Sequence, residues 1–333
     1  MDNIIIYLFF VLGIILMIKG GDWFVESAVW LARVTGIPNI LIGATIVSVA
    51  TTLPELLVST FAIYQYHYDV AIGNVVGSLI CNIGLILGIT TLISPVKIDT
   101  VKFSIKGFFM IFATFGLIIL LKDKIITPQE GNILLILFII YIFINIWEFY
   151  NEEQSGNIQI LFTDINKKSI IINTTKFIFG TIFIMYGAKL VVDNGVLIAK
   201  TIGVPEQVIS VTIIALGTSL PELTTAINAS IKGENQLSIG NILGANILDI
   251  LLVLGASSKI SDRRLVISYQ NFTINNTIYN IPQSLYLDIP IALLLMIILV
   301  VGGSIKGEIN RLIALTILII YIIYLSILVK FFI

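Results

Sequence analysis

Long apolar runs separated by short polar breaks follow one another along almost the whole chain. Each run is long enough to cross the hydrocarbon core of a bilayer, which takes about 20 residues of helix. Because only helices and closed barrels satisfy their backbone polar groups within lipid, runs of this length indicate an all-α integral membrane protein. The pattern predicts ten transmembrane helices, near residues 4–32, 38–65, 70–94, 101–121, 130–149, 169–199, 205–231, 236–257, 286–303 and 310–332.

Two polar stretches interrupt the apolar pattern. Residues 151–168, NEEQSGNIQILFTDINKK, predict a linker near the middle of the chain. Residues 257–284 follow the eighth predicted helix, and the alternation in FTINNTIYNI predicts a small β-hairpin outside the membrane. The amino terminus, MDNIIIYLFF, lacks a basic flank and a small-residue cleavage site, so we expect a membrane helix there rather than a removable signal.

The same sequence pattern occurs twice, with a constant shift of 167 residues. ATTLPEL (50–56) returns as GTSLPEL (217–223), and IGNVVG (72–77) returns as IGNILG (239–244). Internal similarity at a fixed shift, without gaps, is typical of repeated structural units. The chain is therefore expected to consist of two related halves.

The repeat sets the expected organisation of the chain. Residues 1–150 are predicted to form a first repeat of five helices, 151–168 a polar linker, and 169–333 a second repeat of five. Because five is an odd number, the second repeat should enter the membrane from the opposite side. Inverted repeats of this kind are typical of secondary transporters, whose binding site lies near the bilayer midplane between the halves.

Composition narrows the class of protein and its partners. The chain has 57% hydrophobic residues, only 12% charged residues and a mean hydropathy of +1.04, which indicates that the lipid bilayer surrounds it. A net charge of −1 without a basic cluster argues against nucleic acid as a partner. The single cysteine, Cys81, excludes an intramolecular disulfide, and the single histidine, His67, argues against a histidine-based metal site. The pattern carries no signal for an oligomeric state.

The positions of Lys and Arg predict an orientation in the cell membrane. Cytoplasmic loops of membrane proteins carry an excess of these residues. If both termini face outside, the larger share of basic residues falls at the inner loops and helix ends, namely Lys19, Arg33, Lys97, Lys102, Lys106, Lys167, Lys168, Lys176, Lys232, Lys306 and Arg311. We therefore expect a multi-pass protein of the cell membrane with its termini outside.

Each half places a proline and a glutamate together inside an apolar run. Proline lacks an N–H, so Pro54 leaves the Ala50 carbonyl unpaired, as Pro221 does that of Gly217. An unpaired carbonyl at membrane depth is tolerated only where a cavity or an ion satisfies it. The next residue is Glu55 or Glu222, and a carboxylate buried in a bilayer usually marks an ion pathway.

Polar residues around these glutamates recur at helical spacing. Residues three and four apart share one face of a helix. The expected faces carry Thr45, Ser48, Thr52, Glu55 and Ser59 in the first half, and Thr212, Ala215, Ser219, Glu222 and Ala226 in the second. The following helices carry Asn74, Ser78 and Asn82, matched by Asn241, Ala245 and Asp249, with glycines four apart that let helices approach closely. We expect these polar stripes to face each other between the halves.

The available ligands are carboxylate, hydroxyl, amide and carbonyl oxygens, which favour calcium or sodium over zinc or copper. Calcium takes six to eight oxygens, and two bidentate glutamates with the carbonyls of Thr51 and Thr218 supply about six. Two carboxylates about 6 Å apart repel by about 3 kcal/mol at an effective dielectric of 20. Such a site must therefore hold one divalent ion, several monovalent ions or protons, which is a physical basis for exchange.

GATIVSVATTLPE with GNVVGSLICN, and ALGTSLPE with GNILGANILD, resemble the two alpha-repeats of the sodium/calcium exchangers, within the cation/calcium antiporter superfamily. The prokaryotic ten-helix members are similar in length and helix order. The resemblance implies a transporter without a bound cofactor, whose cargo is calcium and sodium. It also implies that the first and sixth helices slide to alternate access.

The resemblance implies roles for individual residues. Calcium is expected at Glu55 and Glu222 together with the carbonyls of Thr51 and Thr218. The sodium sites are expected to draw on Ser48, Thr52, Ser78, Ala215 and Ser219, with both glutamates shared and with Asn82 and Asp249 bordering the central position.

The sequence departs from the family pattern at two of these positions and at Ala245. Ser48 stands where alanine is usual, at a position that contributes a backbone carbonyl, and Thr52 replaces a serine while keeping its hydroxyl. Ala245 replaces a serine whose hydroxyl is expected to bind sodium. We therefore expect sodium to act with weak apparent affinity or reduced cooperativity.

Other functions remain open at this point. A proton- or potassium-coupled calcium antiporter is the nearest alternative to calcium/sodium exchange. A calcium channel normally places a ring of carboxylates around a pore, often from several subunits. An intramembrane hydrolase needs a nucleophile with its base, which neither TTLPE nor TSLPE supplies. The antiporter, which is not an enzyme, is the interpretation that the repeat favours.

Overall fold

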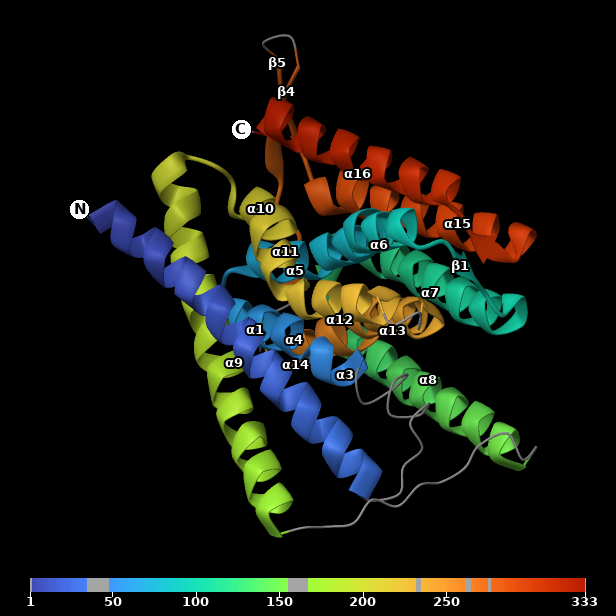
Figure 1. Cartoon of the computed structure of the whole chain (residues 1–333). Coiled ribbons are helices and arrows are strands. Elements are labelled where there is room, and N and C mark those ends of the chain that lie inside the picture. Colours follow the sequence, from blue (N-terminus) through green and yellow to red (C-terminus); the bar gives the residue numbers. More distant parts are fainter. Residues whose placement is uncertain are drawn as a thin grey trace.

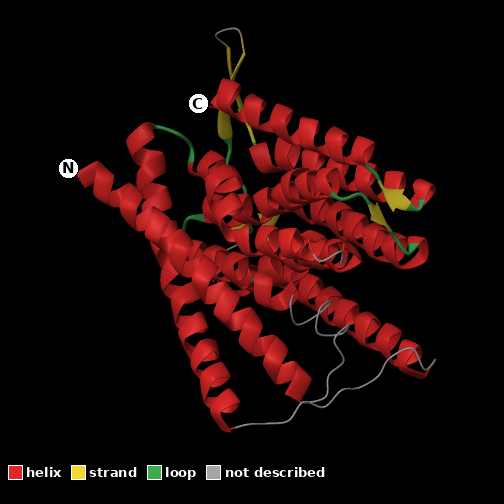
Figure 2. Ribbon diagram, in the orientation of Figure 1, coloured by secondary structure: helices red, strands yellow, loops and turns green. Residues whose placement is uncertain are grey.

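The computed structural model confirms a multi-pass, all-α membrane protein (Figures 1 and 2). Within the described residues, eight helices are long and apolar enough to cross a membrane, and nine if the pair Glu206–Thr218 and Leu220–Ile231, bent by 44°, is one span. The structure describes residues 2–34, 48–154, 167–231, 235–260, 265–274 and 277–332. The start of the predicted span 38–65, with Thr45, and most of the predicted linker 151–168 lie outside these residues.

The helices follow the predicted apolar runs closely. The first half contains α1 (Asp2–Val34), α3 (Ser48–Thr51), α4 (Leu53–Tyr64), α5 (Tyr68–Cys81), η2 (Asn82–Leu87), α6 (Gly88–Ile93), α7 (Thr100–Leu120), η3 (Leu121–Asp123) and α8 (Pro128–Gln154). The second contains α9 (Lys167–Ile202), α10 (Glu206–Ile209), η4 (Ser210–Ile214), α11 (Ala215–Thr218), α12 (Leu220–Ile231), α13 (Asn235–Leu248), η5 (Asp249–Val253), α14 (Leu254–Ile260), η6 (Ser284–Asp288), α15 (Ile289–Lys306) and α16 (Arg311–Phe332).

Three short antiparallel strand pairs join segments at the helix ends. β1 (Val96–Lys97) pairs with β6 (Glu308–Ile309), and β2 (Ile125–Ile126) pairs with β3 (Leu265–Val266). β4 (Gln270–Ile274) and β5 (Thr277–Ile281) form the predicted hairpin, in which Phe272 lies opposite Tyr279. The hairpin extends beyond the helices at the end of the molecule where the carboxyl terminus lies (Figure 1).

Element boundaries repeat with the shift that relates the two halves of the sequence. α3, α4 and α5 of the first half correspond, at every boundary, to α11, α12 and α13 of the second. The helix is interrupted at Thr52 in one half and at Ser219 in the other. Pro54 is tolerated because it stands in the first turn of α4, where the missing N–H has no partner to lose.

The long helices α1 and α9 pack against each other in an antiparallel sense. A Cβ added at Gly13 would lie 2.9 Å from the Gly187 carbonyl oxygen, and one added at Gly20 would lie 2.7 Å from that of Gly180. The repeat relates Gly13 to Gly180 and Gly20 to Gly187. The Gly13–Gly187 contact and the Gly20–Gly180 contact are therefore equivalent under the repeat. The two helices thus meet through equivalent glycines.

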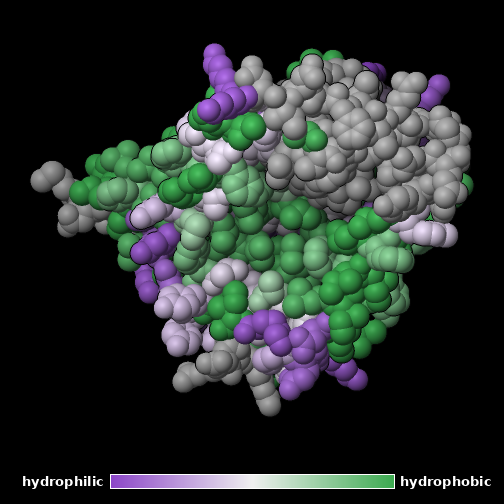
Figure 3. Space-filling view, turned by 90° about the horizontal axis from the view of Figure 1, so that it is seen from below, coloured by the Kyte–Doolittle hydropathy of each residue, from purple (hydrophilic) through white to green (hydrophobic). Residues whose placement is uncertain are grey.

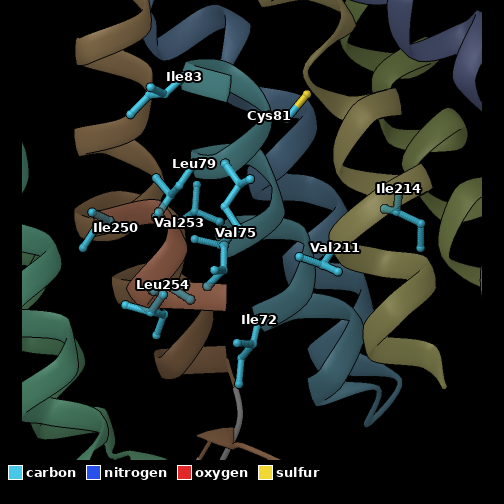
Figure 4. Packing of buried hydrophobic residues seen from close by; sticks show 14 of the residues in the cluster. Ile72, Val75, Leu79, Cys81, Ile83, Val211, Ile214, Ile250, Val253 and Leu254 are labelled. Carbon is cyan, nitrogen blue, oxygen red and sulfur yellow. The ribbon is translucent and has the colours of Figure 1, made fainter. Parts of the chain in front are cut away.

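Burial divides the helices into central and peripheral ones. In Tyr68–Ile93, 78% of the most apolar stretch is buried, and in Ser238–Ile260 83%, whereas only 22% of Pro128–Trp147 is buried. In Figure 4, α5 lies between the helix that carries Val253 and the helix that carries Val211. On the face seen in Figure 3, hydrophobic residues cover much of the described part, and hydrophilic residues gather in patches. Exposed apolar side chains on the outer helices fit a lipid environment.

Candidate ion-binding site

The two glutamates of the repeated motifs occupy equivalent places just after the two helix interruptions. Glu55 lies in the first turn of α4 and Glu222 in the first turn of α12. Each is only 1% exposed. Asp249, which begins the π-helical segment η5, is also 1% exposed. Three carboxyl groups are thus buried in the helix bundle.

These carboxyl groups have few hydrogen bonds. The Ser219 hydroxyl donates to Glu55 Oε1 at 3.4 Å. Among the described residues, Glu55 Oε2 and both carboxylate oxygens of Glu222 and of Asp249 have no hydrogen-bond partner. A buried carboxylate without donors is strongly unfavourable unless a cation or a proton compensates its charge. The donor-poor oxygens are therefore suited to bind cations.

Asn74 joins three helices beside Glu55. Its amide nitrogen donates to the backbone carbonyl of Glu55 at 3.2 Å and to the Ser59 hydroxyl at 3.0 Å. Its amide oxygen accepts a hydrogen bond from Thr218 Oγ1 at 3.1 Å. Thr218 Oγ1 lies 3.5 Å from Ser78 Oγ. Asn74 thereby holds α4, α5 and α11 together around the first glutamate.

The opposite side of the site is joined by different residues. Ser48 Oγ donates to Asn241 Oδ1 at 3.0 Å, which links α3 to α13. Asn82 Nδ2 donates to Asn246 Oδ1 at 2.9 Å, which links η2 to α13. The Ser48–Asn241 contact joins a predicted polar stripe of the first half to one of the second, whereas Asn246 lies outside the predicted stripes. Asn246 was not singled out from the sequence, although it lies one residue after Ala245 in the repeated motif.

Every predicted site residue is at most 1% exposed, namely Ser48, Thr51, Thr52, Glu55, Ser78, Asn82, Ala215, Thr218, Ser219, Glu222 and Asp249. The carbonyl predicted to serve as a ligand at Ser48 already accepts hydrogen bonds from Thr52 N at 3.0 Å, Thr52 Oγ1 at 2.8 Å and Thr51 Oγ1 at 3.3 Å. That of Ala215 accepts from Ser219 N at 3.0 Å, and it lies 3.1 Å from Thr218 Oγ1, whose single hydrogen is shared between this carbonyl and Asn74 Oδ1. In the conformation described, both carbonyls are engaged within their own helices.

The side chains around the two glutamates determine which kind of ion site the described residues can form. In the part of the chain that the structure describes, no three His, Cys, Asp or Glu side chains gather as a metal-binding cluster. A calcium ion at Glu55 and Glu222 would therefore need hydroxyl and backbone oxygens to complete its coordination. The polar residues described above are oxygen donors of that type.

Glycines allow close approach in three of the four predicted places. A Cβ added at Gly73 would lie 2.8 Å from Ser210 Cβ, one at Gly77 2.6 Å from Ala215 Cβ, and one at Gly244 2.9 Å from Ser48 Oγ. At Gly240 an added Cβ meets no described residue within 4 Å, and residue 43, the repeat counterpart of the Gly73 neighbour Ser210, lies outside the described residues. The close packing brings α5 against α11 and α13 against α3.

A second buried polar network was missed by the sequence analysis. The Asp288 carboxylate accepts hydrogen bonds from Tyr324 Oη at 2.9 Å, Gln283 Nε2 at 3.2 Å and Gln207 Nε2 at 3.2 Å. Gln207 Nε2 also donates to Ser284 Oγ at 2.6 Å. Because Asp288 stands at the edge of an apolar run, its position indicated a helix end rather than a buried group. This network ties α10 to η6 and α16.

Comparisons with known proteins agree with this arrangement. A family model described as "Sodium/calcium exchanger protein" matches residues 5–147 and 173–330. An uncharacterised membrane protein of Methanocaldococcus jannaschii is 36% identical over 242 residues, covering 73% of this chain and 78% of that protein. The sodium/calcium exchanger MaX1 of Methanosarcina acetivorans is 28% identical, covering 97% of this chain and 98% of the relative. The solved structure of the sodium-calcium exchanger NCX_Mj, soaked with sodium, matches with a TM-score of 0.65 and 30% identity, covering 97% of this chain and 99% of that one.

Proposed function

The chain belongs to the sodium/calcium exchanger protein family, and from this membership we propose that it is a secondary antiporter that exchanges calcium for sodium by alternating access. In this proposal no resident cofactor takes part, because both ions are cargo. Two similar proteins, MaX1 and NCX_Mj, are both named as sodium/calcium exchangers, which supports the choice of the two ions.

One observation supports calcium/sodium exchange more strongly than the others do. Glu55 and Glu222 come from equivalent places in two related halves, are both buried, and keep carboxylate oxygens without donors among the described residues. A single buried glutamate can serve as a structural hydrogen-bond partner. Two equivalent ones with free oxygens instead provide the negative charge that one divalent ion, or more than one monovalent ion, can neutralise in turn.

The proposed architecture has ten membrane helices in two inverted repeats of five. The antiparallel contact between the equivalent helices α1 and α9 supports the inversion, because related helices on a twofold axis in the membrane plane must run in opposite directions. The shared boundaries of α4 with α12 and of α5 with α13 support the repeat. We place the protein in the cell membrane with its termini outside, on the distribution of Lys and Arg.

The proposed ligands follow from this symmetry. Calcium is bound by the carboxylates of Glu55 and Glu222 and by the carbonyls of Thr51 and Thr218. Sodium is bound by the same carboxylates with hydroxyls and carbonyls of flanking residues, namely Ser48, Thr52, Ser78, Ala215 and Ser219, while Asn82 and Asp249 border the centre. Because the two ions share carboxylates, binding one disfavours the other, and this competition couples their transport.

A second candidate is a calcium antiporter coupled to protons or potassium, and Asp249 is the observation that favours it. The repeat partner of Asp249 is the neutral Asn82, so the second half carries one more carboxyl group than the first. Both Asp249 oxygens lack partners among the described residues. A third carboxylate can attract an additional monovalent cation or hold a proton.

Flux in reconstituted vesicles tests the proposal. The purified protein is placed in calcium-loaded proteoliposomes, and calcium efflux is followed after dilution into sodium, potassium, a proton gradient or an inert cation. Efflux that requires external sodium supports calcium/sodium exchange. Efflux with potassium or a proton gradient alone supports the second candidate. Efflux without any counter-ion would show a channel and contradict antiport.

A further inference from the structure

We propose that the Ser48 hydroxyl supplies to the sodium site of its half the oxygen ligand that Ala245 lacks. The inference rests on the proposed calcium/sodium exchange and concerns the same site. It assigns a ligand role to the Ser48 side chain, in addition to the carbonyl role expected from the sequence.

The packing of the helices shows which residues share a half-site. The α3 helix lies against α13, where a Cβ added at Gly244 would meet Ser48 Oγ at 2.9 Å. In the related place of the other half, α11 lies against α5, where a Cβ added at Gly77 would meet Ala215 Cβ at 2.6 Å. The repeat relates Ser48 to Ala215 and Gly244 to Gly77. The two helix pairs are therefore equivalent.

Each helix pair contains one serine and one alanine at the two positions concerned, but in opposite places. In the α3–α13 pair the serine is Ser48 and the alanine is Ala245. In the α11–α5 pair the alanine is Ala215 and the serine is Ser78. The serine hydroxyl therefore belongs to α3 in the first pair and to α5 in the second. Each helix pair contains one such hydroxyl.

The Ser48 hydroxyl reaches across to the facing helix. Ser48 Oγ donates a hydrogen bond to Asn241 Oδ1 on α13 at 3.0 Å. Asn241, Gly244 and Ala245 are spaced by three and four residues, so they share one face of α13. The hydroxyl oxygen therefore lies over the helix face on which Ala245 presents a methyl group.

The Ser48 hydroxyl also retains the capacity to bind a cation. A serine hydroxyl has one hydrogen and two lone pairs. Since its hydrogen is donated to Asn241, the lone pairs are turned toward other partners, and the residue is fully buried. Ser48 stands one turn before Thr52 and two turns before Glu55, on the polar face that carries the glutamate.

In the α11–α5 pair, the corresponding hydroxyl is that of Ser78. There Asn74, the repeat partner of Asn241, accepts its hydrogen bond from Thr218 Oγ1 at 3.1 Å, and Ser78 Oγ lies 3.5 Å from that oxygen. Each asparagine is thus bonded by a hydroxyl from the facing helix, but Ser48 provides that bond in one half and Thr218 in the other. With Ser48 as a ligand, the number of oxygens is the same in both halves, and Ala245 does not weaken sodium binding.

Sodium titrations of calcium efflux test the inference with a double-mutant cycle. Loss of one ligand of hydrogen-bond strength corresponds to about a fivefold change in affinity. We expect Ser48→Ala to raise the half-saturating sodium concentration about fivefold and Ala245→Ser alone to leave it unchanged. The double variant Ser48→Ala with Ala245→Ser should return to the parent value, because the hydroxyl is restored from the facing helix.

The mirror-image pair provides a matched control. Ser78→Ala should raise the sodium requirement, and Ser78→Ala combined with Ala215→Ser should restore it. If Ser48→Ala does not fold, Ser48→Cys keeps the shape of the side chain with a somewhat larger atom, but offers sulfur, a poor ligand for sodium, and should shift the curve in the same direction.

The outcomes separate this inference from the proposed function. A parent protein that shows no sodium-driven efflux contradicts the proposed function and removes the basis of the inference. Sodium-driven efflux in the parent with an unshifted curve in Ser48→Ala overturns the inference alone. A variant that melts at a lower temperature but keeps the parent sodium curve assigns Ser48 to packing only, which also overturns it.

Discussion

The Ser219 hydroxyl donates a hydrogen bond to Oε1 of Glu55 at 3.4 Å, although 164 residues separate the two in sequence. Ser219 is the residue at which the helix of the second half is interrupted, and Glu55 lies just after the interruption of the first half. The contact therefore brings the two repeated motifs together at one place. A substitution in either motif is expected to affect ions bound by both.

Neutralising either central glutamate should abolish calcium transport. Glu55→Gln and Glu222→Gln keep the size of the side chain but remove half of the charge that balances a divalent ion in a medium of low dielectric. We expect folded, monodisperse proteins with no measurable calcium-dependent flux in proteoliposomes. Glu308→Gln, in the short strand β6 after α15, is the control and should transport as the parent does. Near-normal flux in either central variant would contradict the site.

Asp249→Asn should retain much of the exchange activity. Asp249 is buried, and its repeat partner Asn82 is neutral, so we expect that calcium/sodium exchange does not require a charge at this position. The measurement is sodium-driven calcium efflux, with Asn82→Asp as the complementary variant. Complete loss in well-folded Asp249→Asn would show that the charge is needed, and would favour coupling to potassium or protons.

Gly20→Ala should weaken the packing of α1 on α9. The added Cβ would lie 2.7 Å from the Gly180 carbonyl oxygen and 2.9 Å from the Ile184 nitrogen, so the two backbones must separate. We expect a lower melting temperature in detergent and slower calcium exchange, because van der Waals packing is a main source of helix association in membranes. Gly116→Ala on α7 is the control, since its Cβ would meet no described residue within 4 Å. Equal melting and flux for both variants would refute the importance of this contact.

Tyr324→Phe should lower stability without changing the ion dependence. It removes the 2.9 Å hydrogen bond to Asp288, a buried carboxylate, at a cost of about 1–3 kcal/mol. Thermal unfolding in detergent measures the loss, and the sodium titration of calcium efflux should remain that of the parent. Tyr286→Phe, on η6 with Asp288 but 65% exposed, should have little effect on either. A shifted sodium curve in Tyr324→Phe would link this network to the ion site.

Several features of this protein could be predicted from its sequence because their causes are local. Lipid requires continuous apolar helices, so the helices follow the apolar runs, and α5 begins at Tyr68 where a run was expected from residue 70. Proline cannot continue a helix interior, so the interruptions at Thr52 and Ser219 could be expected from Pro54 and Pro221. Because a repeat preserves both effects, the burial of Glu55 and Glu222 could be expected in both halves.

Only the tertiary structure decided which polar groups meet. Ser48 was expected to act through its carbonyl, but packing of α3 on α13 places its hydroxyl on Asn241, 193 residues away. His67 had no evident partner, and its Nδ1 lies 2.8 Å from a carboxylate oxygen of Glu206 at the start of α10. Such contacts depend on how helix surfaces interlock over the whole bundle, whereas helical periodicity specifies only which face a residue occupies. The sequence therefore determined the helices and the central carboxylates, and the packing between the two halves determined the remaining partners.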